Sequence, residues 1–285
     1  MFKYYSFSEY SVSSVINNEI YMNHYASFND PFECWGEVVT GFPCSTENSQ
    51  RLQAILDAWG YGSIPLIGSE KQQYEEYSDS LLGMEPNVKD AIRAARISCF
   101  SKRADNLLMW SHYANGLRGF CIEFDEALIV EQNDHMAEIY EVSYKETPPI
   151  IDTALIAMLT DQIDYHSDVI HSAKNDEEAE SYNEWLEISI TRSNDIYKKM
   201  LATKPKNWEY EEEIRLIYQS MSIGLDGEFY SYPKKAVKAV IFGEKMPEKQ
   251  QQVLRNVFKQ YSHDIEFKMA KRIKGEFKVQ LESCI

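Results

Sequence analysis

The sequence predicts an α+β fold in which helices interrupt a mixed or antiparallel sheet. Short runs rich in apolar, β-branched and aromatic residues occur along the whole chain, and helical stretches separate them in mixed order. Two long polar stretches, at about residues 45–96 and 149–203, have helical patterns. We therefore expect a single domain over residues 1–285 with helical insertions at these two places.

The first hundred residues begin with a strand, a short helix and a second strand, predicted at residues 2–5, 10–17 and 19–25. The turn SFNDPFE follows, in which Asn29, Asp30 and Pro31 are strong turn formers. Asn29 and Asp30 either only brace this turn or also contribute to a site. Glycine and proline divide the polar stretch at 45–96 into short helices, of which the last, at 87–96, leads into the next strand.

The stretch from Ile97 to Asp125 is the densest in chemistry. It predicts a strand at 97–101, a helix capped by Asp105 and ended by Gly116, and a strand at 119–125 with Phe120, Ile122 and Phe124 on one face. So short a strand–helix–strand unit should bring four polar or aromatic side chains together. They are Ser101, Trp110, His112 and Tyr113. The helical spacing of Trp110 from Leu107 also fits a place in the core.

The second half of the chain predicts a polar loop after Asp125, a strand at 138–144, the helical stretch, and a strand-like run beginning at Trp208. In that run Glu211, Glu213 and Arg215 share one face, opposite an apolar face. The alternative is a helix start, in which Glu211 and Arg215 form a pair four residues apart worth about 0.3 kcal/mol. A strand at 236–242, a helix at 247–261 and strands at 265–269 and 276–281 complete the prediction.

The amino-acid composition disfavours several classes of function. Forty-five acidic against 29 basic residues give a net charge of −16, which disfavours non-specific nucleic-acid binding. No apolar run is long enough to cross a membrane and no signal peptide is visible, so we expect no membrane partner and a cytoplasmic location. Five cysteines without a C-x-x-C pair argue against a disulfide framework or a thiolate zinc site. His166 and His171 lack the spacing of paired helical ligands, and we predict no metal site.

Several motifs together resemble a bacterial family known only as domain of unknown function 2971. The matching segments span nearly the whole chain in order. They are Lys3 and Tyr4 in FKYYS, residues 29–32 in FNDPFE, residues 99–101 in SCFS, MWSHYA, Gly119 in RGFCIEF, WEYEEEIR and VIFG.

A looser resemblance is to the ADP-ribosyltransferase fold, a split sheet with a first strand bearing a polar residue, a later strand ending in Ser and a late strand bearing E-x-E. The corresponding positions are Lys3 or Tyr4, Ser101, and Glu211 with Glu213, and the KYY sequence stands where those enzymes usually have His or Arg. The resemblance implies NAD as substrate. Glu213 would stabilise the oxocarbenium-like ribose and Glu211 would orient or activate the acceptor.

The resemblance also implies supporting roles for residues around these carboxylates. Arg215 would bind pyrophosphate or neutralise the glutamates. Tyr113 and Trp110 would stack on nicotinamide or adenine, and Ser101 and His112 would bind the amide or ribose. We further predict that Ser101 and Tyr113 face Glu213 across a pocket, with Asn29 and Asp30 near its rim.

Three functions compete on the sequence alone. The leading hypothesis is an ADP-ribosyltransferase-like enzyme that uses NAD to modify a protein, nucleic acid or small molecule, with a toxin or phage-defence effector as the biological role. The second is a metal-dependent nuclease with Asp30, His112, Glu211 and Glu213 as ligands. The third is a non-catalytic module that binds a ligand or a protein.

Overall fold

The computed structural model describes residues 1–131, 137–222 and 224–284, and these residues form two compact units. The first unit comprises residues 1–33, 93–146 and 204–285, and the second comprises residues 34–92 and 147–203. The two segments expected to be helical insertions thus make up most of the second unit. That the whole chain is one domain stays a prediction.

The first unit is built on a mixed sheet, and the predicted α+β class is confirmed. The sheet has 10 strands among the described residues, in the order β11-β2-β4-β1-β5-β12-β13-β14, and β10 joins β4 to β6. β12 and β13 are parallel, whereas the other pairs in this sheet are antiparallel. The strands are β1 (Phe2–Tyr5), β2 (Glu19–His24), β4 (Ala95–Ser101), β5 (Phe120–Phe124), β6 (Ala137–Glu141), β10 (Glu213–Gln219), β11 (Glu228–Ser231), β12 (Val237–Gly243), β13 (Glu266–Arg272) and β14 (Val279–Ser283).

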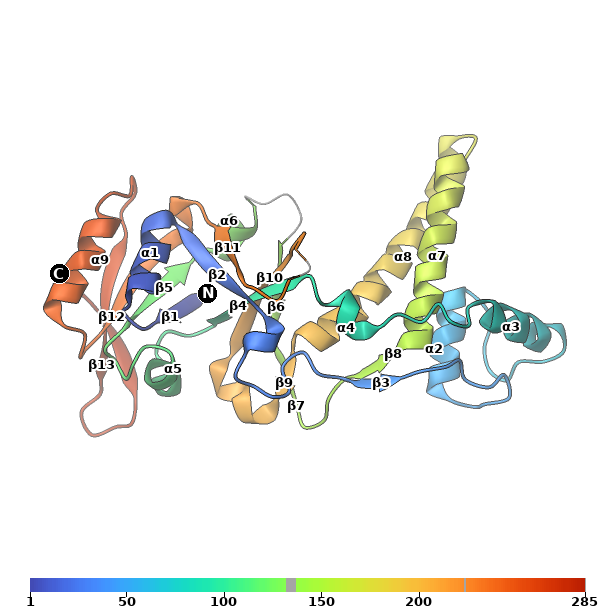
Figure 1. Cartoon of the computed structure of the whole chain (residues 1–285), viewed down its shortest axis with the longest axis horizontal. Coiled ribbons are helices and arrows are strands. Elements are labelled where there is room, and N and C mark those ends of the chain that lie inside the picture. Colours follow the sequence, from blue (N-terminus) through green and yellow to red (C-terminus); the bar gives the residue numbers. More distant parts are fainter. Residues whose placement is uncertain (132–136, 223, 285) are drawn as a thin grey trace. The chain divides into compact units, whose positions relative to one another are not determined.

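Helices cover both faces of this sheet (Figure 1). Alternation along β5 places Phe120, Ile122 and Phe124 in one core cluster, with residues of α1 (Glu9–Asn17) and α9 (Glu248–Phe258), as predicted for this strand. Cys121 points to the opposite face, where it packs with Trp110 of α5 (Leu107–His112). The short α5 is thereby fixed beside β1 and β5.

Two glycines of the recognised motifs allow close backbone contact around α5. A Cβ atom on Gly119 would lie 2.0 Å from the carbonyl oxygen of Tyr5, and one on Gly243 would lie 2.3 Å from that of Leu117. Only glycine fits such distances. These contacts hold the segment after α5 against β1 and β12.

The sheet splits along one edge of β4. β10 pairs with β4 over its whole length, from Glu213 opposite Ser101 to Gln219 opposite Ala95. On the other edge, β1 pairs only at Ser101 and β2 only at Arg96 and Ile97. No described strand pairs with residues 98–100 along that edge, so β1 and β2 diverge and leave the middle of β4 open.

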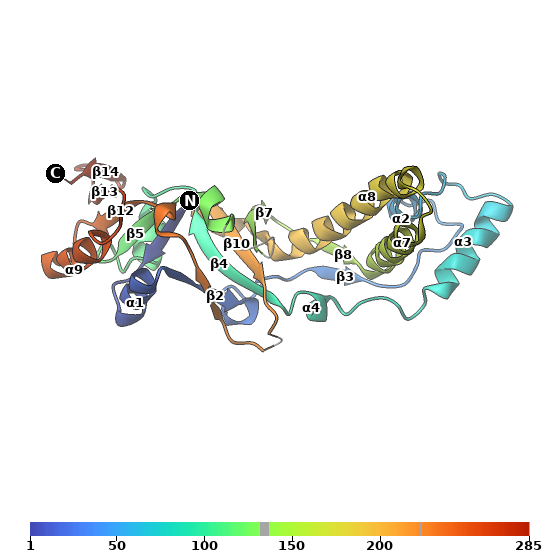
Figure 2. The ribbon, with the colours of Figure 1, turned by 90° about the horizontal axis from the view of Figure 1, so that it is seen from above.

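The second unit is mainly helical, with a short parallel pair of strands (Figure 2). Buried side chains of α2 and α7, among them Leu52, Ile55, Ile156 and Leu159, supply much of its core. Its elements are β3 (Glu37–Val39), α2 (Gln50–Trp59), α3 (Ser69–Ser80), α4 (Val88–Ala91), β8 (Ile150–Asp152), α7 (Thr153–Ser172) and α8 (Asp176–Leu201). None of the described helices combines the length and apolar character needed to span a bilayer.

The predicted N-cap of α5 is wrong by one residue. Asn106 is the N-cap, and its side chain accepts hydrogen bonds from the backbone N–H groups of Leu108 and Met109. Asp105 instead pairs with Arg103, with 2.9 Å between Oδ1 and Nε. The helix ends at His112, and Gly116 lies beyond it in the left-handed region.

The helix predicted at 87–96 is only α4, at Val88–Ala91, because strand pairing overrides the local pattern. β4 begins at Ala95, and the fully buried Arg96 donates to the backbone carbonyls of Ser222, Gly224 and Asp226. These tertiary contacts extend the strand backwards into the predicted helix.

The strand expected to begin at Trp208 begins later. Lys206–Glu211 is a 3₁₀ helix, and Glu212 has a positive φ of 42° that separates it from β10. Glu213 and Arg215 share a strand face as predicted, but Glu211 lies in the 3₁₀ turn. A residue other than glycine rarely adopts this φ, so sequence propensity does not reveal the break.

The remaining differences are local. The loop predicted after Asp125 begins as a helix, α6 (Glu126–Val130), and its residues 132–136 lie outside the described part of the chain. The strand predicted at 138–144 is divided into β6 and β7 (Ser143–Lys145), and β7 pairs with β9 (Thr203–Pro205). α9 ends at Phe258 rather than at 261, and strands β3, β8, β9 and β11 were not predicted.

Candidate functional site

The opening along β4 is a cavity of about 330 Å³ within the first unit. It is walled by β1, β4 and the segment after β2, and charged side chains of the β9–β10 region close its base. Residues that line it include Lys3, Asn29, Cys99, Tyr113, Glu211 and Glu213. Of the sequence-predicted site residues, Lys3, Tyr4, Asn29, Tyr113, Glu211 and Glu213 line the cavity; Asp30, Ser101, His112 and Arg215 are not among its lining residues.

Lys204 joins the two predicted catalytic carboxylates. Its Nζ lies 2.6 Å from Oε2 of Glu211 and 2.8 Å from Oε2 of Glu213. All three side chains are at most 7% exposed. The lysine also lies over the ring of Trp208, 4.8 Å from its centroid. One buried ammonium group therefore holds two carboxylates that would otherwise repel each other.

Arg215 extends this cluster away from the cavity. Its Nε lies 2.7 Å from Oε1 of Glu213, and its Nη1 lies 2.6 Å from Oε1 of Glu33. The side chain is completely buried. Two roles were considered for Arg215, pyrophosphate binding and neutralisation of the glutamates. Its placement favours neutralisation, because a buried guanidinium bound to two carboxylates does not face a ligand.

The two cavity glutamates differ in their protonation. Burial alone would raise the pKa of Glu213, but Arg215 and Lys204 outweigh it and hold the pKa at about 2. Burial raises the pKa of Glu211, and Lys204 only partly opposes this. Burial lowers the pKa of Lys204, but Glu213 and Glu211 outweigh it and raise the pKa above its ordinary value. Glu213 is thus a fixed negative charge, whereas Glu211 is the carboxyl that more readily carries a proton.

This difference predicts an acid-sensitive stability. The folded-state pKa of Glu213 is about 2 against an ordinary value of 4.5, so its stabilising contribution is present above pH 4.5 and is lost as the pH falls towards 2. The gap corresponds to about 3 kcal/mol of unfolding free energy. Glu211, with a raised pKa, has the opposite effect above pH 4.5. Urea unfolding of wild type and Glu213→Gln should therefore show a flatter pH dependence for the variant below pH 4.5, and parallel curves there would contradict it.

Lys3 of β1 bridges the gap between β1 and the open middle of β4. Its Nζ donates to Oγ of Ser98 at 2.7 Å and to the carbonyl oxygen of Cys99 at 3.0 Å, and so satisfies backbone and side-chain groups that β1 leaves unpaired. Burial lowers the pKa of Lys3. Burial, followed by the charge of Glu213, raises the pKa of Cys99, which keeps this cavity-lining thiol protonated.

Three tyrosines surround the two carboxylates, and one of them, Tyr113, binds a carboxylate directly. Tyr113 donates from its hydroxyl to Oε1 of Glu211 at 2.5 Å, and burial together with this bond raises the pKa of Tyr113. The hydroxyl of Tyr144 accepts a hydrogen bond from the backbone N–H of Glu213 at 2.8 Å. Tyr4 lines the cavity but directs its hydroxyl to the carbonyl oxygen of Arg103 and packs edge-on against Trp110.

Ser101 and Asp30 have bracing contacts. Ser101 lies opposite Glu213 in the β4–β10 register, but its hydroxyl is fully buried and donates to the backbone oxygen of Glu211. Asp30 accepts from the backbone N–H of Phe32, which closes the predicted turn, and Asn29 is the turn residue that lines the cavity.

His112 is exposed at the end of α5, with its ring 6.3 Å from that of Tyr113. The four residues proposed as nuclease ligands therefore do not gather in one place. No group of three or more His, Cys, Asp or Glu residues suited to a metal ion occurs in the described part of the chain.

Sequence reasoning missed Lys204, Glu33 and Tyr144. Lys204 lies in the segment KPKNW, where Lys206 has the same local appearance and yet is exposed. The only signal was the proximity of Lys204 to the E-x-E pair. Glu33 follows the recognised NDPF turn, but nothing local indicates that it reaches Arg215.

Fold and site together define an α+β protein with a buried lysine–carboxylate cluster in a split sheet. The family model described as "Protein of unknown function (DUF2971)" matches residues 109–216, which run from α5 to β10 and include the MWSHYA and WEYEEEIR motifs. This match supports the family resemblance that the motifs indicate. No curated protein and no solved structure matches the chain. The resemblance to ADP-ribosyltransferases stays a prediction.

Proposed function

We propose that the protein is an ADP-ribosyltransferase-like enzyme that cleaves the bond between nicotinamide and ribose in NAD, in the cytoplasm. The observation that carries the proposal is the buried, ionised Glu213 at the open middle of a split sheet. In this reaction the C–N bond breaks, and its electron pair leaves with nicotinamide. The ribose carbon becomes positively charged, and an acceptor oxygen or nitrogen attacks it and loses a proton.

A fixed carboxylate suits this chemistry because the positive charge exists only near the transition state. Glu213 is held by two cations and stays ionised at neutral pH, so its charge needs no reorganisation when the bond breaks. Both of its oxygens have protein partners in the absence of a ligand. We assign Lys204 as the exchangeable partner, which turns from Oε2 of Glu213 towards the ligand's phosphates and leaves this oxygen for a ribose hydroxyl.

Glu211 suits the role of the base that takes the acceptor's proton. Its pKa is raised by burial, which makes it a stronger base than an exposed carboxylate, and Tyr113 fixes its position. Tyr113 and Asn29 border the same cavity, and we assign to them the contacts with the nicotinamide end of the ligand. A volume of 330 Å³ lies within the range of small-molecule sites. The acceptor is a protein, a nucleic acid or a small molecule, and a toxin or phage-defence effector is the biological setting we propose.

The direct test uses the wild-type protein and NAD. We expect NAD to raise the melting temperature, since it binds the folded state, and nicotinamide to be released with time. NAD labelled in the adenylate phosphates would show whether the ADP-ribose goes to water or to an added acceptor. Binding without nicotinamide release would instead favour the non-catalytic ligand-binding module. Neither binding nor release, with bacterial protein and RNA offered as acceptors, would overturn the proposal.

A further inference from the structure

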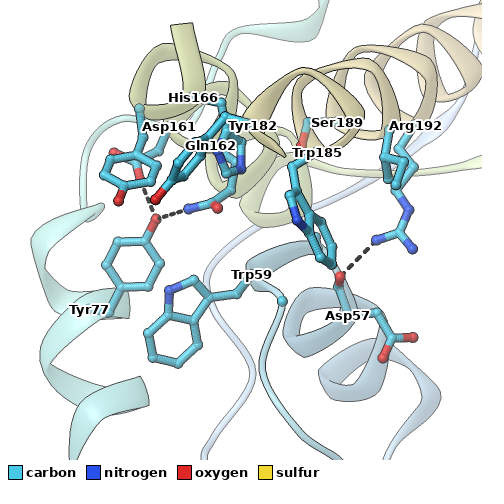
Figure 3. A pocket seen from close by; sticks show the side chains of 14 residues that line it. Asp57, Trp59, Tyr77, Asp161, Gln162, His166, Tyr182, Trp185, Ser189 and Arg192 are labelled. Carbon is cyan, nitrogen blue, oxygen red and sulfur yellow. Dashed lines mark hydrogen bonds between the residues drawn. The ribbon is translucent and has the colours of Figure 1, made fainter. Parts of the chain in front are cut away.

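A second cavity, of about 460 Å³, lies inside the second unit. It is bordered by α2, α3, α7 and α8, and Figure 3 shows aromatic side chains from all four helices or their ends around it. Its residues are independent of the lysine–carboxylate cluster. A volume of this size suits a small organic ligand.

One aromatic ring in this cavity, that of Trp185, does not stack on another ring of the described residues. The ring of Trp59 is stacked with Tyr61 and Tyr77, at centroid distances of 4.3 and 4.7 Å. Trp185 differs, because it is 50% exposed and makes no ring contact with any described residue. Its indole extends from α8 into the cavity (Figure 3). An indole face of this kind is a platform for a planar ring.

His166 provides an unmet hydrogen bond at the cavity wall. It is 8% exposed, its ring packs with Tyr165 and Tyr182, and its buried Nδ1 has no hydrogen-bond partner among the described residues. Leaving such a group unsatisfied costs about 1–3 kcal/mol. Burial lowers the pKa of His166, so the ring is neutral at neutral pH and offers a hydrogen bond rather than a charge.

Two further polar side chains, Asp161 and Gln162, offer acceptors at the cavity wall. The hydroxyl of Tyr77 donates to Oδ2 of Asp161 and accepts from Nε2 of Gln162 at 2.9 Å, as the dashed lines in Figure 3 show. This arrangement fixes both side chains and leaves Oδ1 of Asp161 and Oε1 of Gln162 as acceptors. At the other end, Arg192 donates to the backbone oxygen of Asp57 at 2.8 Å.

We propose that this cavity binds a planar nitrogen heterocycle of the nucleobase class. The ring stacks on Trp185, its N–H or amino groups donate to Asp161 and Gln162, and a ring nitrogen or carbonyl bonds His166. A quaternary ammonium fits less well, because it has no N–H group to donate to Asp161 and Gln162, has no use for the hydrogen bond of His166 and is bound best where several aromatic faces are open. An inorganic anion would meet the carboxylates of Asp57 and Asp161.

The base can come from a free nucleoside or from a single strand, and calorimetric titration distinguishes the two. The probes are adenosine, guanosine, cytidine, uridine, a short single-stranded oligonucleotide, and choline as the cationic comparison. We expect at least one nucleoside to bind. If the oligonucleotide binds and no nucleoside does, the proposal that a nucleobase occupies the cavity stands, and the base is supplied by a single strand. Binding of choline alone, or of none of the probes at millimolar concentration, would overturn the proposal.

Two tryptophan variants make the test specific. Trp185→Ala should weaken binding by about 5- to 150-fold, since stacking on one aromatic ring is worth about 1–3 kcal/mol. Trp35→Ala is the matched control, because Trp35 is also about half exposed, at 48%, lies in the same unit and does not line the cavity. Equal affinity of Trp185→Ala and wild type would refute the site, and nicotinamide release from NAD should be unaffected by either variant.

Discussion

Glu213→Gln is expected to lower the rate of nicotinamide release from NAD by about 10²–10³-fold, the range seen when one preorganised electrostatic group is removed from an active site. Gln has the same shape as Glu, and its amide oxygen can still accept from Arg215. What is lost is the negative charge that opposes the developing positive charge on ribose. The measurement is single-turnover nicotinamide release at pH 7 with saturating NAD.

Glu209→Gln is the control for this variant. Glu209 is exposed in the same 3₁₀ turn and does not line the cavity, so the same chemical change there should leave the rate as in wild type. Circular dichroism and the melting temperature would verify that Glu213→Gln is folded. A folded Glu213→Gln variant that cleaves NAD at the wild-type rate would remove Glu213 from the mechanism and leave the proposed reaction without its central group.

The parts of the fold that were predictable are those that local patterns determine. Alternation of apolar residues placed β5 and its faces correctly, because one face of that strand packs under α1 and α9 and the other under α5. The same alternation identified the face of β10 that carries Glu213 and Arg215. In both cases the alternation of residues along the strand is enough to predict which face is buried.

The errors occurred where distant contacts decide the local structure. Arg96 looked like the end of a helix, yet carbonyl groups more than 120 residues away in the sequence hold it in β4. Glu211 looked like part of a strand, but the left-handed Glu212 turns the chain before β10 begins. The turn nevertheless brings Glu211 and Glu213 to the same lysine, so the E-x-E pair converges by a route that strand periodicity did not describe.

The same reasoning explains why Lys204 was not found. Lys204 and Lys206 flank one proline, and no local property separates them. Lys204 is buried between two carboxylates because β9 pairs with β7 while the 3₁₀ turn folds Glu211 back over it. The side chain of Lys206 is 55% exposed, and its Nζ lies 3.6 Å from Oε1 of Glu146. The same substitution at these two positions therefore shows how much the burial of Lys204 contributes to the free energy of unfolding.

Lys204→Met should destabilise the folded protein by about 3–5 kcal/mol at pH 7, because it leaves two buried carboxylates without their shared cation. Met keeps most of the packing volume of the lysine stem, so the effect reports lost charge. The deficit should shrink as the pH falls from 7 towards 4.5, since Glu211, whose pKa burial already raises above 4.5, then takes up a proton and its repulsion of Glu213 disappears. Urea unfolding at several pH values would measure both effects.

Lys206→Met should change the free energy of unfolding by no more than about 0.5 kcal/mol, as is usual for an exposed ion pair. If both variants were equally stable at pH 7, the cluster of Lys204, Glu211 and Glu213 would not be the tightly coupled unit that its distances indicate. If Lys204→Met were destabilised without any dependence on pH, Glu211 would not be the carboxyl that takes up the proton, and its assignment as the base would fall with it.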